Sequence, residues 1–322
     1  MGVVMNNESV RIPEAERIVI SVITDNLADV TRPDCKIARR LRRTESPLDL
    51  AAHGEHGLAY HVETVVEGES RCCLFDFGSD ARGVLKNMKL LNVDLGKVDA
   101  LAISHDHWDH QAALLDILKM KRGEWRSGLP LYVGECFFEG TYLKGDDGSV
   151  TSLLALNRRE LDDLGVVRIV ETKGPTAIIP GAFLSGRVEQ RAEYEAIPPS
   201  FVARRGNEYV PEAFPGEQAL FMNAKGKGLV VVSACAHRGI INTVRQAQRI
   251  TGIERVHMVI GGFHLTGARP EIIQRTIADM KAIDPVYVVP THCTGFEAIA
   301  AFAREMPDQF ILNTAGTTYV VA

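Results

Sequence analysis

Residues 104–110 read Ser-His-Asp-His-Trp-Asp-His, so three imidazoles and two carboxylates occur in one short stretch. An apolar run at residues 98–103 precedes this stretch and indicates a buried strand. A helical pattern of apolar residues follows at 112–118. The polar cluster is therefore expected on a strand-to-helix turn, where side chains converge just beyond the end of the strand.

The spacing within this stretch favours a metal site in which the side chains converge on two neighbouring points. His105 and His107 share a parity, so an extended chain directs both side chains to the same side. Asp109 and His110 begin the following helix and can face a second point close by. Imidazole and carboxylate are ordinary ligands for zinc and related metals. A lone histidine is usually a surface or core residue, but this pattern after a buried strand predicts metal binding.

The pattern His-x-His-x-Asp-His at 105–110 resembles the signature of the metallo-β-lactamase superfamily. Other segments resemble further motifs of that family in the right order, namely Asp76 at the end of the strand 73–76, the strand 228–233 with the residues after it, and the His motif at 290–295. The resemblance extends from about residue 17 to the end of the chain. It implies an α/β fold, an αββα sandwich of two mixed β-sheets flanked by helices.

A narrower resemblance is to one branch, the family named after 7,8-dihydropterin-6-methyl-4-(ribofuranosyl)aminobenzene 5′-phosphate synthase. Five short motifs carry it, at residues 24–26, 55–58, 233–237, 261–265 and 291–295. The branch label implies a pterin-related activity. The fold and the metal site rest on the wider superfamily pattern and do not depend on this label.

Histidines that follow later strands complete the predicted site. His237 follows the strand 228–233, and His292 ends the strand that begins at Val286. In open α/β sheets, functional groups gather beyond the strand ends. The predicted ligands form two sets, His105, His107 and His237 for a first ion, and Asp109, His110 and His292 for a second.

Other side chains are expected to act around these ligands. Asp76 is predicted to orient a ligand histidine without binding the metal itself. Asp25 and His56 are candidates for lining the site, although Asp25 could instead form a turn with Asn26. His264 follows two glycines that allow a close approach of the backbone, and it is either a further ligand or a residue for substrate contact or proton transfer. His61 and His257 lie in predicted strands and are expected to be structural.

Two features of the wider superfamily are missing. The third histidine of its middle motif has no counterpart near residues 181–186, and Cys235 stands where a bridging Asp is usual. His237 is the expected replacement for that imidazole. Cys235 is either a soft ligand or a buried thiol, and we favour the thiol. Without a bridging carboxylate, one firmly held metal with a weaker second one is consistent with the sequence.

A divalent metal lowers the pKa of a bound water and polarises a carbonyl or phosphoryl oxygen. The sequence therefore predicts an enzyme that hydrolyses an ester, lactone, amide or phosphoester bond of a small molecule. One or two Zn²⁺ ions are expected, with Fe or Mn as alternatives. Asp109, as general base if the second ion is absent, and His264 are the predicted catalytic residues. A pterin-related synthase, a diiron redox or oxygen-handling enzyme and a ligand-binding sensor are the alternatives, of which the intact His/Asp motif disfavours the sensor.

Composition excludes several classes of protein. The 322 residues carry a formal net charge of −5 with no extended basic block, which argues against a nucleic-acid surface. The chain shows no CxxC pair among its six cysteines, no apolar signal segment in residues 1–16 and no apolar run that would span a membrane. We expect a cytoplasmic protein with reduced thiols and a small-molecule substrate. A homodimer is one assembly that the sequence allows.

The motifs spread along the chain without a dividing linker, so we predict a single domain over residues 1–322. Two polar stretches, 27–54 and 187–217, are predicted insertions that could cover the site and select the substrate. The basic run 39–43 is more simply a solvated face than an anion-binding patch. In the first part of the chain, predicted strands follow one another through meandering connections. In the later part, predicted strands, including one at 310–312, alternate with helices.

Overall fold

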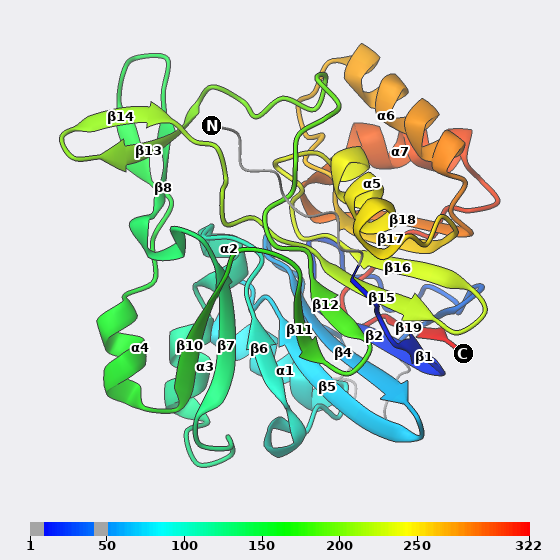
Figure 1. Cartoon of the computed structure of the whole chain (residues 1–322), viewed down its shortest axis with the longest axis horizontal. Helices are drawn as coiled ribbons and strands as arrows, with labels where there is room; N and C mark the ends of the chain where they lie inside the picture. Colours follow the sequence, from blue (N-terminus) through cyan, green and yellow to red (C-terminus); the bar gives the residue numbers. More distant parts are fainter. Residues whose placement is uncertain (1–9, 42–50) are drawn as a thin grey trace.

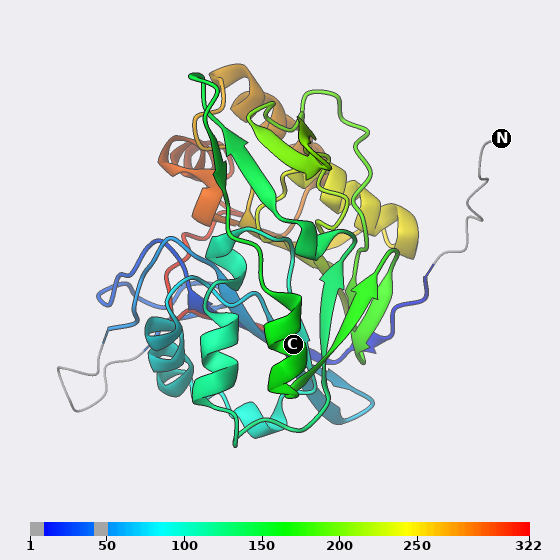
Figure 2. The ribbon, with the colours of Figure 1, turned by 90° about the vertical axis from the view of Figure 1, so that its left-hand side faces the viewer.

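The computed structural model describes residues 10–41 and 51–322. Two β-sheets face each other, and helices cover the outer face of each sheet (Figures 1 and 2). Helices α1, α3 and α4 lie on one side of the molecule and α5, α6 and α7 on the other. This arrangement confirms the predicted αββα sandwich.

The first sheet has eight strands within the described ranges. One half of the sheet is parallel, from the edge strand β10 through β7 and β6 to β5, and the strands from β5 to β3 pair antiparallel. The order across the sheet is β10 (Val167–Thr172), β7 (Leu129–Gly134), β6 (Ala100–Ala102), β5 (Glu69–Phe75), β4 (Ala59–Val66), β2 (Arg17–Thr24), β19 (Thr318–Val321) and β3 (Ala38–Arg39).

The second sheet is antiparallel at one end and parallel at the other. The pairs β16–β17 and β17–β18 are parallel, and the short strand β1 (Glu14–Ala15) also pairs with β15. Its order is β11 (Thr176–Ile179), β12 (Ala182–Leu184), β15 (Leu220–Ala224), β16 (Gly228–Val232), β17 (Val256–Gly262) and β18 (Tyr287–Thr291).

Helices follow the parallel strands, as the alternating part of the sequence predicts. The helical pattern expected at 112–118 corresponds to α3, which begins and ends two residues later. The described helices are α1 (Ala81–Leu90), α2 (Trp108–Gln111), α3 (Leu114–Met120), α4 (Arg158–Leu164), α5 (Ile240–Thr251), α6 (Pro270–Ile283) and α7 (Phe296–Glu305).

Three apolar clusters hold these layers together. One lies between the two sheets and includes Tyr60, Phe75 and Ile260, all fully buried. A second packs α1 and α3 against the first sheet, and a third packs α5, α6 and α7 against the second. Strand β16 is buried along nearly its whole length because it is covered on both faces, which explains its unbroken apolar sequence.

The strand directions bring several chain segments to one edge of the sandwich. In the first sheet, β5 and β6 run parallel, and β2 runs parallel to β5 because both pair antiparallel with β4. In the second sheet, β16, β17 and β18 run parallel. The residues just after these strands carry most of the predicted functional side chains, so the fold accounts for their proximity.

A third, four-stranded sheet was not predicted. Residues 187–217 contain the hairpin β13 (Phe201–Arg205) and β14 (Glu208–Pro211), which pairs with β8 (Thr141–Lys144). Strand β9 (Val150–Ser152) completes this sheet, seen at the upper left of Figure 1. These strands are short and polar, and Pro and Gly residues lie close to them, so the segments carry no clear strand pattern.

Part of the 27–54 stretch contradicts the prediction of a solvated basic face. Arg40 is buried and donates hydrogen bonds to the Leu312 carbonyl and the Thr317 hydroxyl, both at 2.7 Å. These bonds fix the turn beside the edge strand β3. Arg39 is exposed as predicted, and Arg42 and Arg43 lie outside the described residues.

Two further differences concern strands. The predicted strand at 310–312 is a single bridge between Phe310 and Val288, because the chain then turns toward β19. Strands β11 and β15 were not predicted, although β15 is completely buried. Its sequence, Leu-Phe-Met-Asn-Ala, lacks the β-branched residues that mark strands most clearly.

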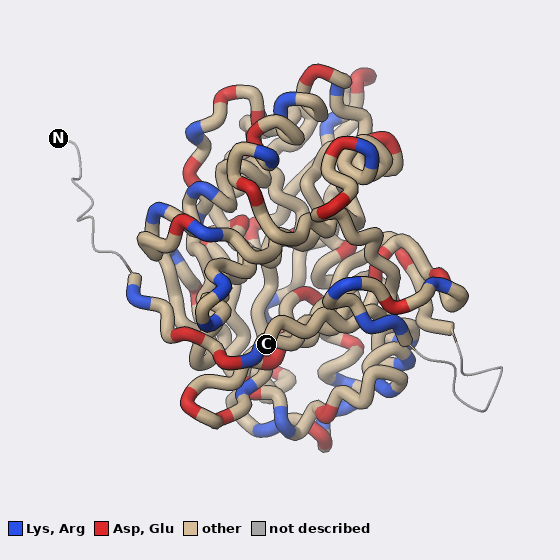
Figure 3. Tube along the Cα trace, turned by 90° about the vertical axis from the view of Figure 1, so that its right-hand side faces the viewer, with Lys and Arg blue, Asp and Glu red and all other residues tan. Residues whose placement is uncertain are grey.

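Basic and acidic residues are interspersed along the trace (Figure 3). Among the described residues, none of the helices combines the length and apolar character that crossing a bilayer requires. The predictions about partners, domain number and assembly stay predictions.

We predict that Arg40→Ala lowers the free energy of unfolding by about 1–3 kcal/mol, because it removes a donor from the buried Leu312 carbonyl and Thr317 hydroxyl. Arg39→Ala, one residue earlier and exposed, is the matched control and should change it by no more than about 0.5 kcal/mol. Urea unfolding measures both. Equal values for the two variants would contradict a structural role for Arg40.

Candidate metal centre

The first predicted ligand set converges at the end of β6 and β16. Donor atoms of His105, His107 and His237 all lie within 4.8 Å of one another, and all three residues are buried. The Nε2 atoms of His105 and His237 are 3.3 Å apart. His107 precedes α2 in extended conformation, so it shares the direction of His105, as the parity argument predicted.

The second set lies beside the first. Donor atoms of its members also lie within 4.8 Å of one another, and these members are Asp109, His110, Cys235 and His292. The Asp109 carboxylate is 3.1 Å from Nε2 of His292 and 3.5 Å from Nε2 of His110. The Cys235 sulfur is 3.1 Å from the same His110 nitrogen. The structure therefore brings all six predicted ligands together and adds a thiol.

The chemistry of these donors fits a divalent cation. His107 Nε2 is buried and makes no hydrogen bond with any residue that the structure describes. Two nitrogens held at about 2.0–2.1 Å by one tetrahedral zinc ion would lie about 3.3 Å apart, as in the His105–His237 pair. Burial lowers the pKa of His107 to about 3 and the pKa values of His105 and His237 well below 6.5. All three imidazoles are thus neutral and carry free lone pairs.

The second set has the opposite electrostatic character. Burial acts to lower the pKa of His110, but the Asp109 and Asp76 carboxylates outweigh it and raise this pKa to about 10. Burial acts to raise the pKa of Asp109, but His110 and His292 lower it well below its usual range. This set is an ion pair that attracts a cation in exchange for a proton. Metal binding here should release that proton.

Asp76 lies directly after β5 and is linked by hydrogen bonds to a histidine of each donor set. Its Oδ2 atom is 2.8 Å from Nδ1 of His110, which leaves Nε2 of that ring for the donor set. The same carboxylate accepts hydrogen bonds from the Ser104 amide and hydroxyl, and Ser104 Oγ is 2.8 Å from Nδ1 of His105. One buried carboxylate thus fixes a histidine in each set. Asp76 has a φ of 62°, a left-handed conformation that is rare outside glycine.

Asp25 and Asn26 support His292 from the end of β2. The Asn26 side-chain oxygen is 3.0 Å from Nδ1 of His292. Asp25 is buried, does not belong to either donor set and accepts hydrogen bonds from the Thr291 hydroxyl and the Asn313 amide. Its carboxylate therefore ties the ends of β2 and β18 together rather than contacting the donors.

His56 lies at the rim of the second set. Its Nε2 atom is 3.5 Å from the Asp109 carboxylate, and its ring centroid is 5.0 Å from that of His292. The side chain is half exposed, so it can contact both this set and solvent. His61 and His257 lie within β4 and β17 and belong to none of the donor clusters in the described part of the chain.

His264 lies beside the first set without belonging to it. Its ring centroid is 4.1 Å from that of His237, and its donor atoms cluster with those of Cys235 and His237. Burial acts to lower the pKa of His264, but its interaction with Cys293 outweighs this and raises it. The residue has a φ of 47°, which turns the chain sharply after β17.

Aromatic side chains from the 187–217 segment cover the first set. Phe214 stacks on His237 with parallel rings 4.1 Å apart, and its centroid is 5.3 Å from that of His107. Phe201 stacks on His107 at 5.4 Å. Phe214 is buried and has a φ of 45°, so the backbone is strained to place this ring. The segment therefore covers the ligands, as the sequence suggested it could.

Glu217 and Arg238 fasten this cover to a predicted ligand. The buried Glu217 carboxylate accepts hydrogen bonds from the backbone amides of His237 and Arg238, at 2.6 and 2.7 Å. The Arg238 side chain donates to the carbonyls of Val188 and Ala213, near the two ends of the segment. The backbone of His237 and the covering segment are therefore held by the same contacts.

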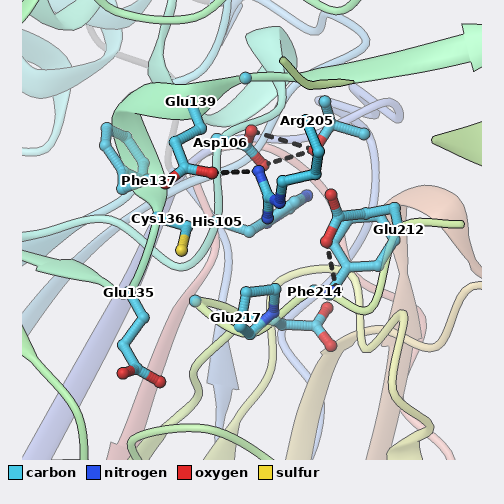
Figure 4. Close-up of a pocket in the computed structure, with 14 residues that line it drawn as sticks. His105, Asp106, Glu135, Cys136, Phe137, Glu139, Arg205, Glu212, Phe214 and Glu217 are labelled. Carbon is cyan, nitrogen blue, oxygen red and sulfur yellow. Dashed lines mark hydrogen bonds and ion pairs between the residues drawn. The ribbon is translucent and has the colours of Figure 1, made fainter. Parts of the chain in front are cut away.

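A small cavity adjoins His105, and its roughly 340 Å³ of empty space includes open solvent (Figure 4). Arg205 projects into it and pairs with Glu139. The other charged groups of the lining are carboxylates, those of Asp106, Glu135, Glu212 and Glu217. Burial raises the pKa of Asp106 to about 7 and also raises that of Glu217, so the negative charge of this lining comes mainly from Glu135, Glu139 and Glu212.

Sequence reasoning missed several of these residues. Asn26 was considered only as a turn former, although its position directly after a strand that ends at the site was a signal. Glu217, Phe201 and Phe214 lie in the 187–217 segment, whose sequence shows no periodic pattern. No local feature of the sequence distinguishes them.

Comparison with known proteins agrees with this geometry. Residues 60–122 match the family model described as the metallo-beta-lactamase superfamily. The 7,8-dihydropterin-6-methyl-4-(beta-D-ribofuranosyl)-aminobenzene-5′-phosphate synthase of Methanocaldococcus jannaschii is 31% identical, over 81% of this chain and 88% of the relative. The chain belongs to the metallo-β-lactamase superfamily. The family and this relative support an enzyme, and the fold implies metal binding.

Solved structures of this superfamily share the fold. One, described as a metal-dependent hydrolase of the beta-lactamase superfamily, superposes with a TM-score of 0.70 at 26% identity, over 94% of this chain and 98% of its own. The metallo-beta-lactamase fold protein YhfI of Bacillus subtilis has a TM-score of 0.51 at 13% identity, over 94% and 99% of the two chains. At that identity, the YhfI likeness concerns the fold alone.

We predict that Asp76→Asn weakens metal binding by about 10- to 100-fold, because the amide no longer holds His110 and Ser104 as the carboxylate does. Titration of the metal-free protein with Zn²⁺ against a competing chelator measures this. Asp80→Asn, at the half-buried N-cap of α1 and outside both donor sets, is the control and should keep the wild-type affinity. Equal affinity for Asp76→Asn and wild type would contradict the role of Asp76.

We predict that cobalt-substituted protein shows a thiolate-to-cobalt charge-transfer band and that Cys235→Ser abolishes it, because Cys235 lies among the second-set donors. The exposed Cys136 is outside every donor cluster of the described residues, so Cys136→Ser should keep the band. Ultraviolet absorption during cobalt titration is the measurement. A spectrum without the band in wild type would show that Cys235 is only a buried thiol, as the sequence favoured.

Proposed function

We propose that this enzyme is a zinc-dependent hydrolase that cleaves an ester, lactone, amide or phosphoester bond of a small molecule. The observation that carries the proposal is the convergence of two adjacent donor sets, built from six imidazole or carboxylate side chains and one thiol. A bound divalent cation supplies Lewis acidity and a water of lowered pKa. The mixture of imidazole and sulfur donors favours zinc over magnesium or calcium.

His264 is the side chain best placed to move a proton. It lies against His237, yet it belongs to neither of the two principal donor sets. Its Nδ1 atom is buried and has no hydrogen-bond partner among the described residues. His264 can therefore act as a general acid that gives a proton to the leaving group. Its sharp backbone turn keeps the ring at the edge of the donor cluster.

Asp109 is the second predicted catalytic residue. Its carboxylate contacts His110 and His292 and remains ionised because these imidazoles lower its pKa. If no second ion binds, an ionised carboxylate in this position can accept a proton from the attacking water and orient it. Phe201 and Phe214 cover the neighbouring imidazoles and limit the access of bulk water. Exclusion of water strengthens the electrostatic interactions inside the site.

A second candidate function is a pterin-related synthase. The observation that favours it is the identity of 31% with the M. jannaschii synthase across most of both chains. In this case the same donor cluster would activate a nucleophile of the substrate in place of water. The two functions differ in the nucleophile and share the metal centre. Assays with different substrates therefore distinguish them, whereas measurement of the metal content does not.

We predict that chelation of the metal abolishes hydrolysis of bis(4-nitrophenyl) phosphate and 4-nitrophenyl acetate, and that added Zn²⁺ restores it. His264→Gln should lower kcat for methyl phenylacetate by about 10²- to 10⁴-fold, because its methoxide leaving group needs the proton of a general acid, and leave the bound metal unchanged. Release of 4-nitrophenol, release of acid in a pH-stat for the methyl ester and elemental analysis are the measurements. His257→Gln, in the strand that precedes His264, is the matched control and should keep wild-type kcat.

Full turnover after verified removal of the metal would rule out the proposed function. Metal-loaded protein that hydrolyses none of the esters, yet joins a 6-methyl-dihydropterin donor with a leaving group to 4-(β-D-ribofuranosyl)aminobenzene 5′-phosphate, would establish the synthase instead. Liquid chromatography with mass detection of the product distinguishes these outcomes.

A further inference from the structure

We propose that the cleft beside His237 and His264 binds the substrate, and that this substrate is an amphipathic anion. Its apolar body would lie against Ile197, Leu265 and Ile272, and its negative group would meet Arg269 at the mouth. The inference rests on the proposed function only in taking the donor cluster as the place of reaction. It adds the chemical class of the substrate and a residue that selects it.

The cleft adjoins the donor cluster directly. It encloses about 1060 Å³, part of which is open to solvent, and both His237 and His264 line it. Each of these residues has a buried Nδ1 atom without a hydrogen-bond partner among the described residues. A molecule bound in this cleft would therefore contact the edge of the first donor set and the predicted general acid.

Most of the cleft wall is apolar, and it comes from two segments. Residues 196–199 of the covering segment, Ala-Ile-Pro-Pro, form one side, and the turn after β17 with the start of α6 forms the other. Leu265 and Ile272 of the second side pack on the apolar cluster beneath. Two prolines restrict the backbone of the first side. A preformed apolar wall of this kind fits a ring or an acyl chain.

The charges at the cleft favour a negative group at its mouth. Arg269 is exposed, precedes α6 and forms no ion pair with any residue that the structure describes. Glu195 also lines the cleft, but its carboxylate accepts hydrogen bonds from the amides of Ile241 and Asn242 at the start of α5. Burial raises the pKa of Glu195 to about 7, so near neutral pH it carries less than a full negative charge. Arg269 is therefore left to bind a ligand anion.

The other cavity at the donor cluster would repel the same ligand. That cavity holds the carboxylates of Glu135, Glu139 and Glu212 and a single arginine, which is paired with Glu139 (Figure 4). Asp106 and Glu217 also line it, but burial raises the pKa of both carboxyl groups. An anionic substrate would be disfavoured there by like charge. The apolar cleft is thus the approach that suits both parts of an amphipathic anion.

Binding of unreactive ligands tests this inference without requiring turnover. The probes are 4-phenylbutyrate, which has a ring, a short chain and a carboxylate, and 4-phenylbutan-1-ol, which has the same body without the charge. Titration calorimetry is performed on the zinc-loaded and on the chelated full-length protein. We expect wild type to bind the carboxylate about fivefold more tightly than the alcohol, the upper end for an exposed ion pair.

Arg269→Ala should reduce the affinity for 4-phenylbutyrate to that for the alcohol, with and without zinc. Arg304→Ala, an exposed arginine on α7, is the matched control and should have no effect. Ala268→Trp, which fills the cleft, should abolish binding of both probes, whereas Ala282→Trp on the exposed face of α6 should leave it intact. If Ala268→Trp does not fold, the two arginine variants alone decide.

Three results would overturn the inference. The first is failure of wild type to bind either probe. The second is binding of 4-phenylbutyrate that is lost when the metal is removed and is unchanged by Arg269→Ala, because the carboxylate would then contact the metal. The third is equal affinity for both probes. Binding as expected without any hydrolysis would leave this inference intact and count only against the proposed function.

Discussion

The alignment of strand ends across the sandwich is the constraint on which the site depends. β5 and β6 of one sheet and β16, β17 and β18 of the other deliver their following turns to a common edge. These turns are tight, with φ angles of 62° at Asp76, 47° at His264 and 52° at His292. Left-handed conformations of this kind cost of order 1–3 kcal/mol each. The apolar core between the sheets must offset this cost. The geometry of the ligands therefore depends on the packing of the core.

The clustering of buried imidazoles is itself a reason for a cation. His105, His107 and His237 are neutral, because burial lowers their pKa values, and their lone pairs approach one another. A proton can join one pair of these nitrogens, whereas a tetrahedral cation can bind all three. The adjacent Asp109 and His110 already form a charged pair that a cation can enter by displacing a proton. Since metal binding adds to folding stability, the fold and the ion are coupled.

The two donor sets could be predicted from sequence because their signals are local. The spacing of 105–110 and the position of each later histidine after an apolar strand are visible without the fold. Glu217 and Phe214 could not be predicted, because their contacts exist only when the covering segment folds back over the site. Arg40 shows the same limit, since its basic neighbours suggest a solvated face while its partners lie near the end of the chain. Non-local contacts, rather than weak propensities, set this limit.

The covering segment and the substrate cleft have separate tasks. Glu217 holds the amides of His237 and Arg238, Arg238 holds both ends of the segment, and Phe214 stacks on His237. Lifting the segment would therefore disturb the backbone of a predicted ligand. The cleft reaches His237 and His264 without any such movement, because it is already open to solvent. A rigid cover that excludes water on one side, with an open apolar approach on the other, keeps the ligands in place while substrates enter and products leave.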